Sequence, residues 1–232
     1  MHWKEIQLTD NNHFTYNGCM LFDKKFIQAL KFHEPGFAPV HDKTGWYHID
    51  IQGMPFYTKR YECVFGYYAM RASVIEHGMW FHIDKHGKRV YSQNYAFTGN
   101  FQKGRCVVRN EHGYYFHIDL HGERVYQENY RYVGDYKDGY ACVQLLSGKF
   151  KHIDMHGKFI YIAEFDDLGV FHKNFATAKD ERGWFHIDEY GKQCYEMCYN
   201  MIEPFYNGQA RVQRHDSTFL LIDETGMEIR QL

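Results

Sequence analysis

The sequence predicts an all-β fold built from tandem repeats, and three observations support this class. The tripeptide His-Ile-Asp recurs five times, and a glycine follows three residues after each of these Asp residues. Aromatic residues recur at fixed distances from that glycine. A helical stripe of apolar residues is absent outside Phe26–Phe32, a segment that aligns with strand and loop in the other repeats.

The repeated glycine divides the chain into seven units. Successive glycines lie 34 or 35 residues apart, and a weaker copy of the motif, Leu221–Asp223, precedes the last one. A fixed period of this length is typical of repeat architectures. We therefore expect one β-repeat domain over residues 1–232, with units centred on turns at Gly18, Gly53, Gly87, Gly122, Gly157, Gly191 and Gly226.

The first element of each unit is a predicted hairpin. Segments such as 114–119 and 123–126 are short, aromatic or β-branched in composition, and separated by a tight turn. In the pattern Asp-x-x-Gly the carboxylate is expected to accept the backbone N–H two residues on, while the glycine takes a positive φ. The first unit lacks the Asp, and Thr15 is expected to take its place.

The second element is an aromatic segment that follows the hairpin. In the first six units aromatic residues lie four, eight and fourteen positions after the repeated glycine, and a small residue then follows, such as Ala141. A hairpin is only marginally stable by itself, so these aromatic side chains are expected to be buried where units stack. Each unit is therefore a hairpin with one or two further short strands.

The His and Asp of the motif lie on one face of an extended strand, as in many metal sites. Equivalent histidines in a repeat array are separated by the width of a unit, so the ligands of such a site do not converge. We expect each His to hydrogen-bond a neighbouring strand or to pack on a Tyr. The sequence predicts neither a metal site nor a cofactor.

Composition excludes several classes of function. The 27 basic and 29 acidic residues nearly balance and form no basic stripe, which argues against nucleic-acid binding. Membrane-spanning apolar runs and the apolar core of a signal peptide are absent, so we expect a cytoplasmic protein without a membrane partner. Cys106 and Cys142 occupy equivalent positions where other units mostly have alanine, which predicts small buried side chains. Cys194 and Cys198 have no second pair to complete a zinc site.

The repeat resembles the WG (KWG) repeats of bacterial proteins. The likeness is clearest in Gly183–Asp188 with Gly191-Lys192, and in the segments 101–104 and 135–141, and it extends from about His13 to Gly226. This chain resembles a divergent subgroup, because the residue after the Trp position is an aromatic or a lysine. The resemblance implies a β-rich repeat fold used for binding or scaffolding, sometimes beside a separate enzymatic domain such as a methyltransferase, and no catalytic residues.

The arrangement of the seven units has two candidate forms. The chain begins with a segment, Lys4–Leu8, that could add a strand to the first unit, and it stops within a unit at Leu232. Complementary ends are typical of closed propellers, whereas an open solenoid has polar caps. We therefore expect a propeller-like closed array, with an open β-solenoid as the alternative.

The candidate binding residues lie where the repeats differ most. The position after the third aromatic is polar or amphipathic in the first six units, and residues 165–184 and 202–214 gather acidic, basic and tyrosine side chains. Arginine beside aromatic residues can hold a carboxylate or a phosphate. The candidates are His33, Arg105, Arg109, Asp167, His172, Lys173, Glu203, Tyr206, Asn207 and Arg211.

These features favour a non-catalytic module that binds a protein, peptide or small polar ligand through a polar–aromatic face. The alternative is an enzyme, or the recognition domain of an enzyme system, with an acid–base pocket around His172 and Glu203. A structural spacer is the third possibility. Established catalytic motifs such as Gly-x-Ser-x-Gly, His-Glu-x-x-His and the Walker loop are absent from the sequence.

Overall fold

The computed structural model describes all 232 residues, which form β-strands, turns, irregular connections and a single three-residue 3-10 helix. The strands form seven small antiparallel sheets of three or four strands, which follow one another in chain order. The predicted all-β class and the predicted seven small units are confirmed. The chain divides into two compact units, residues 1–113 with 117–124 (the N-terminal unit) and residues 114–116 with 125–232 (the C-terminal unit).

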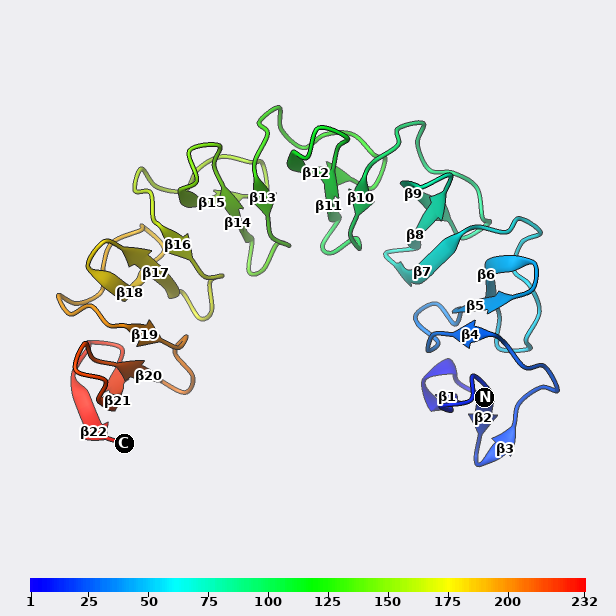
Figure 1. Cartoon of the computed structure of the whole chain (residues 1–232), viewed down its shortest axis with the longest axis horizontal. Coiled ribbons are helices and arrows are strands. Elements are labelled where there is room, and N and C mark those ends of the chain that lie inside the picture. Colours follow the sequence, from blue (N-terminus) through cyan, green and yellow to red (C-terminus); the bar gives the residue numbers. More distant parts are fainter. The chain divides into compact units, whose positions relative to one another are not determined.

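The N-terminal unit contains three complete sheets, two strands of the fourth sheet and the last three residues of its third strand (Figure 1). Only the end of the predicted first strand is extended, because Trp3–Glu5 forms the 3-10 helix η1. The strands are β1 (Gln7–Leu8), β2 (Phe14–Tyr16) and β3 (Cys19–Met20); β4 (Gln28–Ala29), β5 (Ala38–Asp42) and β6 (Gly45–Ile49); β7 (Cys63–Tyr68), β8 (Arg71–Glu76) and β9 (Met79–Asp84); and β10 (Phe97–Thr98) and β11 (Arg105–Arg109).

The C-terminal unit contains the last three sheets and the first two residues of β12 (Tyr115–Asp119), the last strand of the fourth sheet. The last sheet has an additional edge strand, β22, whose residues are all exposed. The strands are β13 (Tyr132–Val133), β14 (Tyr140–Gln144) and β15 (Phe150–Asp154); β16 (Asp167–Leu168), β17 (Ala176–Asp180) and β18 (Gly183–Ile187); and β19 (Met201–Ile202), β20 (Gln209–Gln213), β21 (Phe219–Asp223) and β22 (Glu228–Gln231).

The Asp-x-x-Gly turns form as the sequence predicts. In the third sheet Oδ1 of Asp84 accepts the backbone N–H groups of His86 at 2.8 Å and Lys88 at 2.9 Å. The N–H of Gly87 donates to the Asp84 carbonyl, and Gly87 has a φ of 73°. The carboxylate therefore satisfies one donor more than we expected. The same pair of carboxylate bonds recurs at Asp50, Asp119, Asp154, Asp188 and Asp223.

The first turn has a different geometry. Tyr16 pairs directly with Cys19, and the two residues between them, Asn17 and Gly18, have φ values of 50° and 77°. This is a two-residue hairpin turn that needs no side-chain acceptor. Thr15 lies within the strand pair, opposite Met20, so it does not replace the turn Asp.

The core forms where the glycine of each Asp-x-x-Gly turn packs against an aromatic ring of the preceding unit. A Cβ atom added to Gly122 would lie 2.3 Å from Cδ1 of Tyr91, so only glycine fits above this ring. Gly53, Gly87, Gly157, Gly191 and Gly226 make the same kind of approach to the aromatic residue of the preceding unit. Cys106 and Cys142 are buried and carry free thiols, as predicted.

Candidate functional site

The histidine of the repeated motif is a buried structural residue. In the third sheet His82 is 1% exposed, its Nδ1 lies 2.6 Å from the Tyr91 hydroxyl, and its Nε2 lies 3.0 Å from the Gly99 carbonyl oxygen. A carbonyl can only accept, so Nε2 donates its hydrogen to Gly99, and Nδ1 of the neutral ring accepts from Tyr91. We call this arrangement the histidine latch.

The latch joins one sheet to the next. His48 lies on β6 of the second sheet, and its Nε2 is 2.8 Å from the carbonyl of Phe65 on β7 of the third sheet. The Nδ1 partner is always the tyrosine nine residues on, and the carbonyl is always seventeen residues on. The other two latches with these contacts are His152 with Tyr161 and Gly169, and His186 with Tyr195 and Glu203. His117, in the equivalent position, is 1% exposed.

Burial keeps the latch histidines neutral. Loss of hydration lowers the pKa of His48, His82, His152 and His186 to about 4. Both ring nitrogens are hydrogen-bonded, so neither is available for a metal or for proton transfer. The expected hydrogen bond to a neighbouring strand is confirmed. No group of three or more His, Cys, Asp or Glu side chains is placed to hold a metal ion.

The variable position after the third aromatic opens a hairpin turn in each of the first six units. We call the turns His33–Phe37, Tyr68–Arg71, Gln102–Arg105, Lys137–Tyr140, His172–Phe175 and Tyr206–Gln209 the hairpin tips. All but the first are two-residue turns closed by a β-bridge or strand pair. The backbone of these five is nearly constant while the side chains of all six tips differ, so the units differ chemically at the tips.

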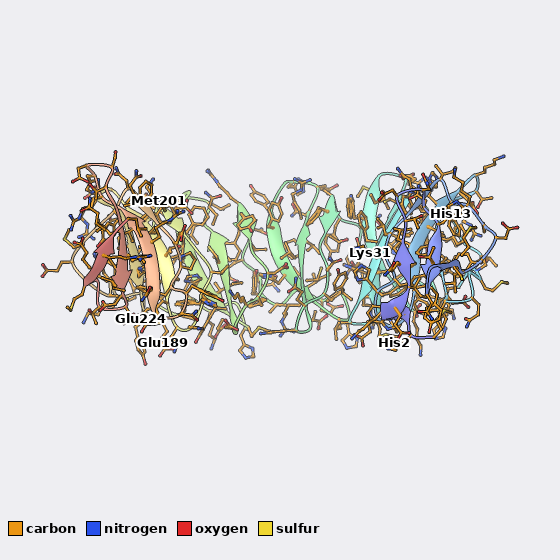
Figure 2. The ribbon with its side chains drawn as sticks, turned by 90° about the horizontal axis from the view of Figure 1, so that it is seen from below. His2, His13, Lys31, Glu189, Met201 and Glu224 are labelled. Atoms are coloured by element: carbon orange, nitrogen blue, oxygen red, sulfur yellow. The ribbon has the colours of Figure 1, made fainter.

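In the second to seventh sheets the tips and the Asp-x-x-Gly turns lie at the same end. Ala176, which follows the tip 172–175, pairs with Ile187, which precedes the turn at Asp188. Within the C-terminal unit, Glu189 and Glu224, the residues after two turn aspartates, lie at one edge, and Met201 lies at the opposite edge (Figure 2). Side chains from tips and turns can therefore gather at one edge.

The first two tips and η1 enclose a hollow of about 360 Å³, which we call the aromatic hollow. The His33 ring lies 5.6 Å from the ring of Tyr68, and a Cβ atom on Gly66 would lie 3.0 Å from Cδ2 of His33. Glycine at position 66 thus lets the two tips approach. The lining residues are Trp3, His33, Glu34, Tyr67, Tyr68, Ala69 and Met70.

One wall of the aromatic hollow has an unfavourable backbone. Ala69 and Met70 have φ values of 49° and 60°, the left-handed region that costs about 1–2 kcal/mol for a residue with a side chain. At the second turn position the other two-residue tips have Gly104, Gly139, Asn174 and Gly208, residue types that tolerate this region. Met70 is therefore the exception at a position where glycine is the relaxed choice.

A second hollow, of about 260 Å³, lies between two tips of the C-terminal unit. We call it the His172 hollow. It combines a histidine and a lysine with two carboxylates, so its chemistry is more polar than that of the aromatic hollow. The lining residues are Asp138, Tyr140, Phe171, His172, Lys173, Asn174 and Glu189.

The remaining candidates predicted from sequence are distributed over both ends of their sheets. Arg105 closes a tip, whereas Arg109 pairs with Phe97 at the far end of the same strand. Asp167 is exposed and pairs with Lys179, at the end of the sheet opposite the tip that contains His172 and Lys173. The structure therefore separates Asp167 from His172 by the length of β17.

Glu203 lies outside the lining of the His172 hollow. Its carboxylate forms an ion pair with Arg211, Oε1 to Nη2 2.6 Å, and its backbone carbonyl accepts the latch bond of His186. Tyr206 and Asn207 belong to the last tip, where Tyr206 is 73% exposed and Asn207 has a φ of 51°. The acids that accompany His172 are Asp138 and Glu189 instead.

Sequence reasoning missed Trp3, Glu34 and Met70 of the aromatic hollow, and Asp138 and Glu189 of the His172 hollow. Met70 had a detectable sequence signal, because glycine or asparagine stands at its position in four other units. Asp138 follows the variable position after the third aromatic, so it also lies within the variable segment. Trp3 and Glu189 are brought in only by the three-dimensional arrangement.

None of the helices in this chain has the length and apolar character of a membrane span. No family model matches the sequence, and no curated protein matches it.

Similar solved structures include the computationally designed protein Ika8, at 10% identity and a TM-score of 0.49, covering 98% of this chain and 83% of that one. BamB from Moraxella catarrhalis is 12% identical with a TM-score of 0.49, over 98% of this chain and 84% of BamB. The WD40 β-propeller domain of Doa1 is 14% identical with a TM-score of 0.37, over 89% and 85%. We draw no function from these likenesses.

Proposed function

We propose that this chain is a non-catalytic binding module that recognises a protein, peptide or small polar ligand through its hairpin tips. The observation that supports this most is that the repeated residues and the variable residues of the tips have different roles. The His, Tyr and Asp side chains that could perform chemistry are hydrogen-bonded within the fold, as His82, Tyr91 and Asp84 illustrate. The tips, in contrast, present different side chains on one backbone, and both hollows described above lie between tips.

The test is selection of binding peptides from a displayed library on the purified protein, followed by affinity measurements on variants. Tip variants His33→Ala and His172→Ala are expected to lose binding of the selected peptides. Glu181→Ala is the matched control, because Glu181 is exposed in the turn between β17 and β18, at the opposite end of the hairpin from His172. Equal loss in the control, or no loss at any tip, would contradict the proposal.

An acid–base function at the His172 hollow is the second candidate. It is favoured by one observation, that a histidine and two carboxylates, Asp138 and Glu189, line the same hollow. In this second candidate function the carboxylic acid beside His172 is Glu189 or Asp138, and not Glu203 as the sequence predicted. Turnover in a hydrolase substrate screen that is abolished by His172→Ala and kept by Glu181→Ala would support it over binding alone.

We further propose, from the sequence resemblance, that the chain is a divergent WG-repeat protein of the cytoplasm. A closed, propeller-like array belongs to the same proposal, with the open solenoid as the alternative. Small-angle scattering tests closure, because a closed array of 232 residues has the radius of gyration of a compact domain, roughly 17 Å. A much larger radius would favour the solenoid.

A further inference from the structure

We propose that the aromatic hollow binds the cationic side chain of a basic residue, lysine or arginine, on a partner polypeptide. The inference rests on the proposed binding function and names the chemistry of one site within it. Three features of the hollow support it: its aromatic lining, its single carboxylate, and the strained turn that forms one wall.

The lining suits an organic cation. Trp3 and the 36% exposed Tyr68 contribute aromatic rings that a ligand can reach, whereas Tyr67 is 2% exposed. The faces of such rings attract ammonium and guanidinium groups, with tryptophan the strongest of the ring types. The chain's own Lys4 Nζ lies 5.4 Å from the centre of the Trp3 ring, and the His2 ring stacks on the same indole at 5.6 Å, so a ligand cation at Trp3 takes the place of the Lys4 ammonium group.

The charge of the hollow selects for the same ligand. Glu34 is the only acidic residue of the lining, which contains no lysine or arginine, and the nearest cation, Lys4, lies over the Trp3 ring. A cation entering among the rings can therefore pair with Glu34, whereas an anionic ligand would meet its repulsion. The volume of about 360 Å³ lies in the range of ligand pockets, roughly 300–1,000 Å³, and exceeds that of one side chain.

The strained turn is the independent observation. A left-handed Met70 opposes folding, and such strain concentrates at functional positions. Met70 is 37% exposed and Tyr68 is 36% exposed, so the turn presents both side chains at the hollow and leaves part of each accessible. A Gly at position 70 would relax the backbone and remove one wall of the site.

The experiment uses the full chain with its four tryptophans replaced by 5-fluorotryptophan, and assigns the Trp3 resonance with Trp3→Phe. The probes are blocked pentapeptides with one central residue: lysine, trimethyllysine, arginine or acetyllysine. The cationic peptides are expected to shift the Trp3 signal and to bind at least about tenfold more tightly than the acetyllysine peptide. Choline is the small-molecule probe, and it is expected to bind more weakly than the trimethyllysine peptide.

Three variants test the assignment to this hollow. Glu34→Gln should remove most of the preference for cationic peptides, and Met70→Gly should weaken their binding while raising Tm by about 2–4 °C. His77→Asn is the matched control, because His77 is exposed in the turn at the opposite end of β8 and also has a positive φ, 52°. It should bind as the wild type does.

Equal binding of the lysine and acetyllysine peptides would overturn the proposal, and so would wild-type affinity in Glu34→Gln and Met70→Gly. Choline binding more tightly than trimethyllysine peptide would overturn the assignment to a polypeptide. Different results would refute the proposed binding function and this inference. Library peptides that bind through the tips without a basic residue would leave the binding function standing and refute only this inference, whereas no tip-dependent peptide at all would refute both.

Discussion

The latch histidines and the tip histidines are the same residue type in opposite environments. His82 and His152 are about 1% exposed with both ring nitrogens hydrogen-bonded, and they recur at a constant position in the repeat. His33 and His172 are partly exposed, occur at the tips of two units only, and each lines a hollow. Repetition of a reactive residue type thus indicates a role in the fold, and departure from the repeat indicates a role in binding.

The largest expected effect is loss of stability in acid. The folded-state pKa of His48, His82, His152 and His186 is about 4, below the unfolded value of about 6.5, so protonation favours the unfolded chain. Stability is full above pH 6.5 and falls as the pH decreases toward 4. Each latch histidine lowers the free energy of unfolding by at most about 1.4 kcal/mol per pH unit, and the four together lower it by several kcal/mol per pH unit.

Urea unfolding midpoints at pH 7.5, 6.5, 5.5 and 4.5 measure this dependence. Replacing one latch histidine, for example His82→Gln, lowers stability at neutral pH but should reduce the part of the pH slope that these four histidines cause by about one quarter. The tip variant His172→Gln should keep the wild-type slope. A midpoint that is constant from pH 6.5 to 4.5 would contradict the neutral, buried latch.

The next effect concerns two glycines that share a positive φ and differ in their surroundings. Gly122→Ala places a methyl group 2.3 Å from the Tyr91 ring, so both backbone strain and overpacking apply, about 2–5 kcal/mol in total. Gly104→Ala, at a tip with φ of 77°, meets no atom within 4 Å and should cost about 1 kcal/mol. Thermal and urea unfolding measure the stability of both variants. Equal losses of stability would mean that the Tyr91 ring moves aside without cost.

Removing one hydroxyl should have a smaller effect. Tyr91→Phe leaves the ring in place beneath Gly122 and deprives Nδ1 of His82 of its donor, which costs about 1–3 kcal/mol for a buried acceptor. The matched control is Tyr206→Phe at a tip, where the ring is 73% exposed and the cost should be within 0.5 kcal/mol, a typical surface value. A cost below about 0.5 kcal/mol at Tyr91 would show that the latch does not depend on this bond.

The sequence predicted the parts of this structure that depend on neighbours along the chain. The Asp-x-x-Gly turn involves residues within four positions of Asp84, and the burial of Cys106 follows from small residues at equivalent positions. The latch partners of His82 lie nine and seventeen residues away, so they became identifiable only with the register between sheets. Glu203 was predicted beside His172 because both lie in divergent segments, but the ion pair with Arg211 holds its carboxylate on its own sheet.

The smallest effect is expected for that ion pair. The side chains of Arg211 and Glu203 are 49% and 46% exposed, so solvent screens the pair and Arg211→Ala should cost less than about 0.5 kcal/mol. The latch of His186 should be unaffected, because it uses the Glu203 backbone carbonyl and not the carboxylate. Urea unfolding in low and high salt measures the stability of Arg211→Ala, with Glu203→Gln as the partner variant.

A loss of stability above about 1 kcal/mol in Arg211→Ala would mean that Arg211 also packs against Phe219, whose ring centre is 5.7 Å from the Arg211 guanidinium carbon. Arg211 would then belong to the fold, and the division between repeated and variable residues would not hold in the last sheet.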